Sequence, residues 1–195
     1  METNKIFTND WKIVLPDTNL VVIPVTPSNA ITYIKVSFKP ETAEIQDTHV
    51  KYLTQHYIES RIKREYLRVL VLQNEEIVGF DALGKFSQPT DEIQTVNVGI
   101  AFVPGFLGKG FGAKFLRVLL RLSCEIQTDQ VQMGTLLDNT AMRALAKKFG
   151  LTETLGIVDR ENGGRIAEVM YLNIDRNAFR DVPLDVTFGE EVVVL

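Results

Sequence analysis

The stretch VNVGIAFVPGFLGKGFG, residues 96–112, combines an apolar run, a Pro-Gly pair and a glycine-rich turn. The apolar run predicts a strand, and the residues after the turn predict a helix. A turn that opens a helix in this way can hold a phosphate, because unpaired backbone N–H groups and the positive end of the helix dipole point the same way. Its glycines allow positive φ angles and a close approach of the backbone to a pyrophosphate; they are Gly108, Gly110 and Gly112. The alternative is a tight turn without a ligand, since a lone glycine motif is a weak signal.

The helix that follows is predicted over residues 113–124, AKFLRVLLRLSC. Its apolar residues form one broad face, which suits a helix packed on a sheet. They are Phe115, Leu116, Leu119, Leu120 and Leu122. The cationic side chains of Lys114, Arg117 and Arg121 are predicted off that face. Lys109 adds a mobile positive charge at the rim of the glycine turn.

The composition limits the class of protein. A chain of 195 residues with 45% hydrophobic content suits one domain with a substantial core. The 21 basic and 25 acidic residues give a net charge of −4 without a basic cluster, so we expect no nucleic-acid partner. A mildly acidic protein is compatible with a cationic substrate such as an amine.

Cysteine and histidine are scarce. Cys124 is the single cysteine, and with two histidines, His49 and His56, it cannot form a disulfide within the chain or an obvious zinc site. We therefore expect a cytoplasmic protein without a metal. Cys124 is predicted at the end of a helix, where the dipole opposes a thiolate, so it is no candidate nucleophile. Because no long apolar stretch and no signal-peptide pattern occur, we also expect no membrane partner.

The order of predicted elements points to a mixed fold. Strands are predicted at 11–15, 20–25, 66–72, 77–86, 93–103, 130–137, 151–158 and 166–174, and helices at 48–64, 113–124 and 141–149. Residues 28–38 satisfy neither period, and Pro24 suggests an edge strand or a bulge. This order predicts an α/β (α+β) fold with one mixed, largely antiparallel sheet and helices on both faces. We expect one domain over 1–175, followed by a tail over 176–195. The tail can add a strand, dock on a partner or fray.

Two motifs resemble the GNAT superfamily, the acetyl-coenzyme A dependent N-acyltransferases. The first runs from Phe102-Val103-Pro104 through Leu107-Gly108-Lys109-Gly110-Phe111-Gly112. The second begins at Asn139 and ends with Lys148-Phe149-Gly150-Leu151. The resemblance is strongest over residues 96–154. Within the superfamily it is nearest the branch that includes the ribosomal-protein alanine acetyltransferases, of the RimJ and RimL type. It implies the acyl-CoA N-acyltransferase fold.

The resemblance also implies a cofactor site for acetyl-coenzyme A or coenzyme A. Backbone N–H groups would cradle the pyrophosphate; they belong to Leu107, Gly108, Lys109, Gly110, Phe111, Gly112 and Ala113. The strand would splay at Ala101, Phe102 and Val103, whose backbone groups would bind the pantetheine arm and polarise the thioester carbonyl. Asn139 would contact the pantetheine arm or brace the cofactor from the next helix.

The chain departs from the family pattern at three positions. Leu107 replaces a usual Arg or Gln, and Ala146 stands where many members carry the Tyr that protonates the leaving thiolate. Asn97 stands where some members carry a Glu base, and it can orient a water but cannot take a proton. Attack by an alkyl amine requires a base, because the amine is mostly protonated at neutral pH. The candidate carboxylates are Glu92 and Asp81, each with a solvated surface role as the alternative.

We therefore predict an N-acetyltransferase that transfers an acetyl group from acetyl-CoA to a primary amine of a small molecule or peptide. The amine would attack directly in a ternary complex, with Asn97 and Glu92 as catalytic candidates. The first alternative is a non-catalytic module of the same fold that binds coenzyme A or a protein. The second is an NAD-binding oxidoreductase, because Gly108, Gly110 and Ala113 also satisfy the dinucleotide fingerprint. The sequence leaves a homodimer open.

Overall fold

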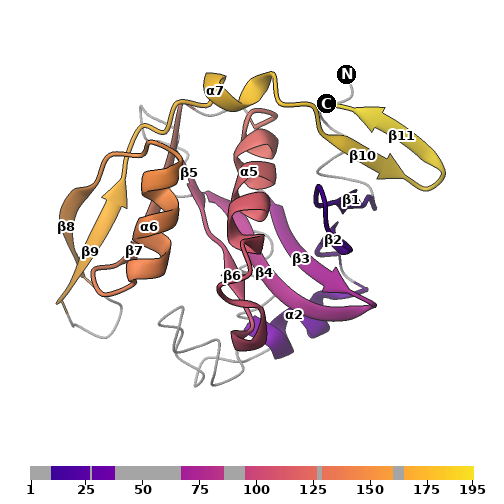
Figure 1. The fold of residues 1–195 in the computed structure, drawn as a ribbon, viewed down its shortest axis with the longest axis horizontal. Coiled ribbons are helices and arrows are strands. Elements are labelled where there is room, and N and C mark those ends of the chain that lie inside the picture. Colours follow the sequence, from indigo (N-terminus) through magenta and orange to yellow (C-terminus); the bar gives the residue numbers. More distant parts are fainter. Residues whose placement is uncertain (1–9, 27, 38–66, 86–94, 127–128, 160–164) are drawn as a thin grey trace.

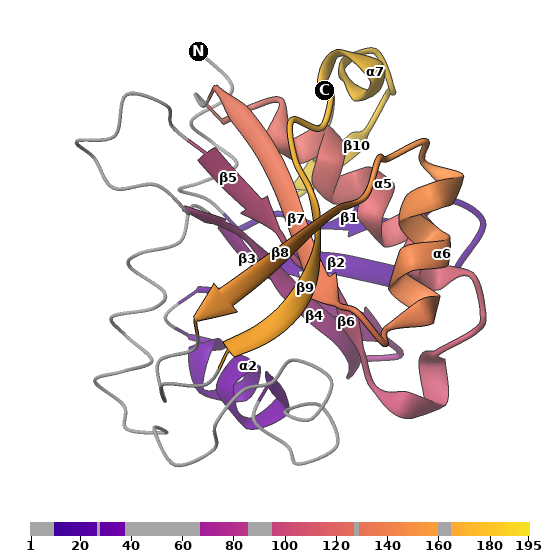
Figure 2. The same ribbon diagram turned by 90° about the vertical axis from the view of Figure 1, so that its left-hand side faces the viewer.

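The computed structural model describes residues 10–26, 28–37, 67–85, 95–126, 129–159 and 165–195. Within them the main sheet is mixed and has nine strands, in the order β1-β2-β3-β4-β5-β7-β9-β8, with β6 paired to β4 outside that order. Every neighbouring pair is antiparallel except the parallel pair β5 and β7. Helices α5 and α6 cover one face, and α2 lies against the other (Figures 1 and 2). The predicted fold class is confirmed.

The strands of the main sheet have the following bounds: β1 Ile13–Val14, β2 Leu20–Pro24, β3 Leu67–Gln73, β4 Glu76–Lys85, β5 Thr95–Val98, β6 Ala101–Phe102, β7 Gln130–Leu136, β8 Thr154–Asp159 and β9 Arg165–Tyr171. The helices are α2 Ala30–Ser37, α5 Phe111–Ser123, α6 Thr140–Lys148 and α7 Asn177–Arg180, and a short 3-10 turn spans Pro104–Phe106. A second sheet pairs β10 Asp185–Phe188 with β11 Glu191–Val194.

Residues 28–38, which fit neither period, contain α2. The Asn29 amide oxygen accepts from the N–H of Thr26, and the Asn29 carbonyl accepts from the N–H groups of Thr32 and Tyr33, which starts the helix. Tyr33 packs edge-on against Phe80 of the sheet, with ring centroids 5.9 Å apart. The contact between Tyr33 and Phe80 therefore favours the helix, which the hydrophobic period of residues 28–38 did not indicate. The helix predicted over 48–64, with His49 and His56, lies outside the described residues.

The hairpin predicted from residues 66–72 and 77–86 is formed by β3 and β4. Asn74 and Glu75 connect the strands with φ angles of 49° and 68°. Two such residues suit the tight turn that matches the twist of paired strands. Because β2 lies between β1 and β3, the edge strand that Pro24 suggested is not formed. Pro24 is instead the last residue of β2, beyond the residues that pair with β1, so its missing N–H leaves no gap in that ladder.

The strand predicted over 93–103 is interrupted. It forms β5 and β6, which are separated by Gly99 and Ile100. An ideal Cβ on Gly99 would lie 2.6 Å from Asp81 Oδ2. The Asp81 carboxylate therefore occupies the space that any side chain at position 99 would need. The interruption lies directly before the glycine turn and shapes the candidate site.

Helix α5 buries the predicted face of Phe115, Leu116, Leu119, Leu120 and Leu122 against the sheet. Each buried leucine contributes about 1.5–3 kcal/mol relative to an exposed one. Arg121, predicted off that face, is nevertheless buried. Its Nε donates to Val182 O at 3.0 Å and its Nη1 to Glu125 Oε1 at 2.6 Å, which compensates the charge.

Residues 176–195 fold with the rest of the chain. Phe179, Leu184 and Val186 are buried in the main core, and the backbone of Thr187 in β10 exchanges two hydrogen bonds with Lys12. The hairpin of β10 and β11 is therefore attached beside β1, as Figure 1 shows. None of the helices described is long and apolar enough to cross a membrane.

Candidate functional site

The site begins where β5 and β7 separate. Their parallel ladder joins Thr95 with Gln130, Val96 with Val131, and Asn97 with Gln132. Beyond Asn97, β6 pairs with β4, while β7 from Met133 onward pairs with β9 on its other side. Within the described residues, the edge of β6 that faces β7 thus has no strand partner. A gap in the middle of a sheet exposes backbone groups that must bind something else.

The backbone groups that face this gap can be assigned by alternation. The N–H groups of Gly99 and Val103 donate to Ala82 O at 3.0 Å and Val78 O at 2.9 Å in β4. Because successive residues of a strand point their backbone groups to opposite sides, the N–H groups of Ile100 and Phe102 face β7. Of the three predicted residues, Phe102 therefore faces the gap, whereas Ala101 and Val103 face β4. Ile100 was missed, because a motif does not give the direction of an N–H group.

The glycine turn presents an open helix N-terminus. Gly108 and Gly110 have φ angles of +74° and +81°, and no atom lies within 4 Å of an ideal Cβ on either. Gly110 is the N-cap of α5 and offers no side chain to the first N–H groups of the helix. Since such N–H groups carry partial positive charge, the turn is suited to an anion. Gly112, predicted with them, has no positive φ, and an ideal Cβ on it would lie 3.5 Å from Leu145 Cδ2 of α6.

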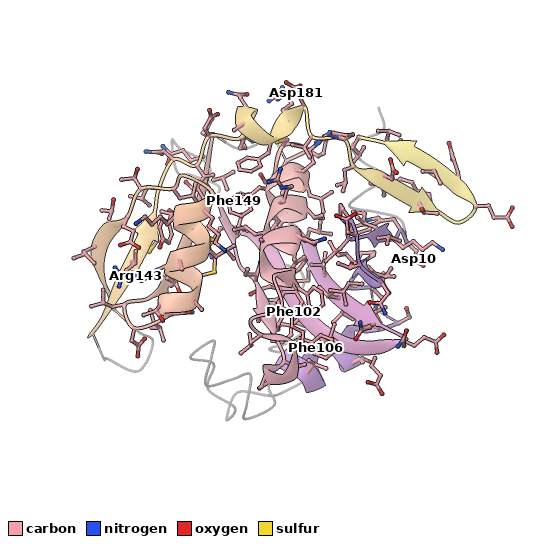
Figure 3. The ribbon with its side chains drawn as sticks, viewed as in Figure 1. Asp10, Phe102, Phe106, Arg143, Phe149 and Asp181 are labelled. Atoms are coloured by element: carbon pink, nitrogen blue, oxygen red, sulfur yellow. The ribbon has the colours of Figure 1, made fainter. Side chains whose placement is uncertain are left out.

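Side chains around the turn provide a hydrophobic base. The ring centroids of Phe106 and Phe111 lie 6.2 Å apart, and those of Phe102 and Phe111 lie 6.4 Å apart. Figure 3 shows Phe102 and Phe106 below the start of α5. Lys109 extends its Nζ over the Phe106 ring at 4.8 Å, and Leu107 is 53% exposed. Lys109 thus supplies the only charge on the turn itself, while Leu107 supplies no polar side chain.

Helix α6 begins at Asn139, the second predicted contact. Its Oδ1 accepts from the N–H of Met142 at 3.0 Å, so the side chain caps the helix. This local role accounts for the amide oxygen. No hydrogen bond joins Nδ2 to the described residues, which leaves this donor for a ligand. Ala146 has no ionisable group and is fully buried in the core, so this position supplies no general acid.

The residues proposed to orient a water or accept the proton lie at different places. Asn97 is half-buried at the end of the ladder, and Asp81 lies against Gly99 where the strand breaks. Burial lowers the pKa of Arg68 to about 10, and the negative charge of Asp81 opposes this effect. The two side chains are therefore close enough to interact. Glu92 lies outside the described residues.

Behind α6 lies a polar cluster of three side chains. Arg143 donates from Nε and Nη2 to both carboxylate oxygens of Glu153, at 3.1 and 2.9 Å, and the Tyr171 hydroxyl donates to Glu153 Oε1 at 3.0 Å. Arg143 also donates to Leu137 O, which fixes the loop before Asn139 (Figure 3 labels Arg143). The hydrogen bond from Arg143 lowers the pKa of Glu153.

This cluster predicts alkaline sensitivity. Burial, and then the hydrogen bond to Glu153, raise the pKa of Tyr171 from 10.0 to about 12. Because the raised pKa favours the neutral phenol in the folded state, its contribution is intact below pH 10 and is lost as the pH rises through 12. In urea titrations we expect the wild type to lose more stability than Tyr171→Phe between these values. Parallel pH profiles of the two proteins would contradict the assignment.

Cys124 is not prepared for reaction. Its thiol donates to Arg176 O at 3.3 Å, and burial raises its pKa. Since the thiolate is the reactive form, the prediction that Cys124 is no nucleophile agrees with these contacts.

Comparisons with known proteins identify the class. A model of the acetyltransferase (GNAT) domain family matches residues 19–152. The chain belongs to this family and is therefore an acetyl-CoA dependent N-acetyltransferase. The predicted resemblance is therefore confirmed. No curated protein sequence matches the chain at a significant level.

Solved structures share the fold. RimL, a ribosomal L7/L12 α-N-protein acetyltransferase in complex with coenzyme A, is 18% identical over 87% of this chain and 99% of its own, with a TM-score of 0.60. The acetyltransferase yncA from Salmonella typhimurium, with acetyl-CoA, is 20% identical over 85% and 99%, with a TM-score of 0.61. The ribosomal-protein-S5-alanine acetyltransferase from Vibrio fischeri is 13% identical over 81% and 95%, with a TM-score of 0.58.

Proposed function

We propose that this protein, acting in the cytoplasm, transfers the acetyl group of acetyl-CoA to a primary amine of a small molecule or peptide. The observation that carries the proposal is the gap between β6 and β7, which opens beside the uncapped N-terminus of α5. The gap suits an extended arm that binds through backbone groups, and the helix N-terminus suits a phosphate. Coenzyme A contains both an extended pantetheine arm and phosphate groups.

The cofactor would lie along these two features. The turn from Leu107 to Ala113 would hold the pyrophosphate, and the N–H groups of Ile100 and Phe102 would bind the pantetheine arm and the thioester oxygen. The Nδ2 of Asn139 would donate to the same arm. A cavity of about 380 Å³ begins at Ala113, and its lining includes the cationic side chains of Lys114, Arg117 and Lys148, which suit the remaining phosphate. The relatives RimL and yncA, solved with coenzyme A and acetyl-CoA, support coenzyme A as the ligand.

Two protons must leave the nitrogen of the protonated amine, one before the attack and one after the nitrogen has bonded to the thioester carbon. Asn97 would hold a water that passes the first proton to a carboxylate, for which Asp81 and Glu92 are the candidates, and the second would pass to solvent. The amine nitrogen then bonds to the thioester carbon, the carbon–sulfur bond breaks, and coenzyme A leaves as a thiolate. A backbone N–H aimed at the developing oxyanion would lower the barrier. With Ala146 in place of a tyrosine, solvent would protonate the thiolate.

Thermal unfolding with separate titrations of acetyl-CoA, coenzyme A and NADH tests the cofactor. A ligand at about 100 times its dissociation constant adds roughly 2.7 kcal/mol, which is several degrees for a chain of this size. We expect acetyl-CoA and coenzyme A to raise the melting temperature and NADH to leave it unchanged. A shift with NADH alone would favour the dinucleotide alternative.

Release of free thiol with a panel of amines then tests the transfer. Thiol release that depends on both acetyl-CoA and an amine is the expected result. Binding of acetyl-CoA without release by any amine would instead support the alternative of a non-catalytic module on the same fold.

A further inference from the structure

The face of the sheet opposite α5 and α6 carries polar side chains at its centre. On β5 and β7 the alternate residues Val96, Val98, Val131 and Met133 fill the helix-covered core. The residues between them must point to the other face, because side chains alternate along a strand. These are Thr95 and Asn97 on β5, with Gln130 and Gln132 on β7; we call them the polar strip. Beneath α2 this face carries the apolar residues Leu70, Phe80 and Ala101, together with Arg68, whose guanidinium lies 4.7 Å from the centre of the Tyr33 ring.

Gln132 is the member of the polar strip that the fold does not explain. The residue is 6% exposed, and its Nε2 has no hydrogen-bond partner among the residues that the structure describes. A buried amide donor left unsatisfied costs about 1–3 kcal/mol, so a purely structural position would favour an apolar residue. This amide is placed for a ligand that supplies an oxygen.

The position of Gln132 indicates which ligand. It pairs with Asn97 in the last step of the ladder before β6 and β7 separate. Helices α5 and α2 lie on opposite sides of the sheet (Figure 2). The glycine turn leads into α5, whereas the polar strip, by its alternation with the core residues, faces the side of α2. A cofactor held at α5 and an acceptor held at the polar strip would therefore meet in the gap from opposite faces.

We propose that Gln132 determines acceptor specificity by donating from Nε2 to a neutral oxygen of the amine substrate; this rests on the proposed function. Side chains of paired residues on neighbouring strands lie about 5 Å apart. Asn97 can thus lie beside the reacting nitrogen while Gln132 donates to an oxygen two or three bonds away in the same substrate. The polar strip carries no charged group, and its unsatisfied group is the Nε2 donor of Gln132, so it suits a neutral carbonyl or hydroxyl oxygen.

Two conjugates of coenzyme A test the proposal without turnover. In each, an –S–CH2–C(=O)– link joins the cofactor sulfur to an amine nitrogen, in one case of glycinamide and in the other of n-propylamine. The two differ in the terminal amide that carries the oxygen. Calorimetry should show the wild type binding the glycinamide conjugate about tenfold or more tightly than the propyl conjugate, as one hydrogen bond to a buried group predicts.

The variant Gln132→Leu separates specificity from structure. We expect its preference to fall to within about twofold, because the propyl conjugate keeps its affinity and the glycinamide conjugate loses its hydrogen bond. Its melting temperature should equal or exceed that of the wild type, since an unsatisfied donor is removed. The control Thr135→Val makes a similar polar-to-apolar change at a buried residue of β7 and should keep the full preference.

Two outcomes would overturn the proposal: a wild type without preference, or a variant in which both affinities fall together. Thiol release with glycinamide and n-propylamine, measured separately, tests the proposed function. Selective binding without thiol release would refute the transfer and show only that Gln132 selects a ligand with an oxygen. Thiol release without selective binding would support the transfer and refute the role of Gln132.

Discussion

Gly110→Asp should lower the affinity for acetyl-CoA by about a hundredfold or more. The new carboxylate would stand at the N-cap of α5, where the proposed pyrophosphate binds, and juxtaposed like charges cost several kcal/mol. The fold should survive, because aspartate is a favoured N-cap and tolerates a positive φ better than most residues. Calorimetry with coenzyme A measures the loss, and the circular dichroism spectrum verifies the fold.

Gly110→Asn is the matched control. Asparagine has nearly the shape of aspartate and also tolerates the φ of +81°, but it carries no charge. We expect it to retain most of the affinity that Gly110→Asp loses. If the two variants bind coenzyme A equally, the turn does not hold the pyrophosphate, whatever the absolute affinity.

Local signals in the sequence predicted the elements that hold the cofactor. The glycines after an apolar run fixed the turn, and Asn139 with a glycine eleven residues later fixed both ends of α6. Such features act within a few residues, through caps and positive φ angles, so they are legible in one sequence. The fold class followed from the order of these elements.

Contacts between distant residues could not be predicted in this way. The break between β5 and β6 depends on Asp81, which lies 18 residues before Gly99 in the chain. Arg121 is buried and donates to the carbonyl of Val182, 61 residues further along the chain, which its position off the apolar face of the helix did not indicate. The importance of Gln132 likewise depends on which strand stops pairing beside it. Each of these needs the tertiary arrangement.

Gly79→Ala should destabilise the protein by roughly 2 kcal/mol, which lowers the melting temperature by about 4–8 °C. Gly79 of β4 pairs with Phe102, and an ideal Cβ there would lie 2.9 Å from Ala101 O and from two carbons of the Phe102 ring. A backbone oxygen cannot turn aside as a long side chain can. The added methyl group must therefore push β6 away from β4.

Because β6 borders the gap, the same change should weaken cofactor binding. The N–H of Phe102 would move with the strand, so we expect a lower affinity for coenzyme A in calorimetry at a temperature where the variant is folded. Gly156→Ala in β8 is the control, since its Cβ would meet only Met170 Cγ, at an ordinary 3.6 Å. Alanine should leave stability there unchanged or slightly higher. Equal stability and equal affinity in Gly79→Ala and the wild type would mean that β6 can shift without cost, and that the cofactor does not depend on its position.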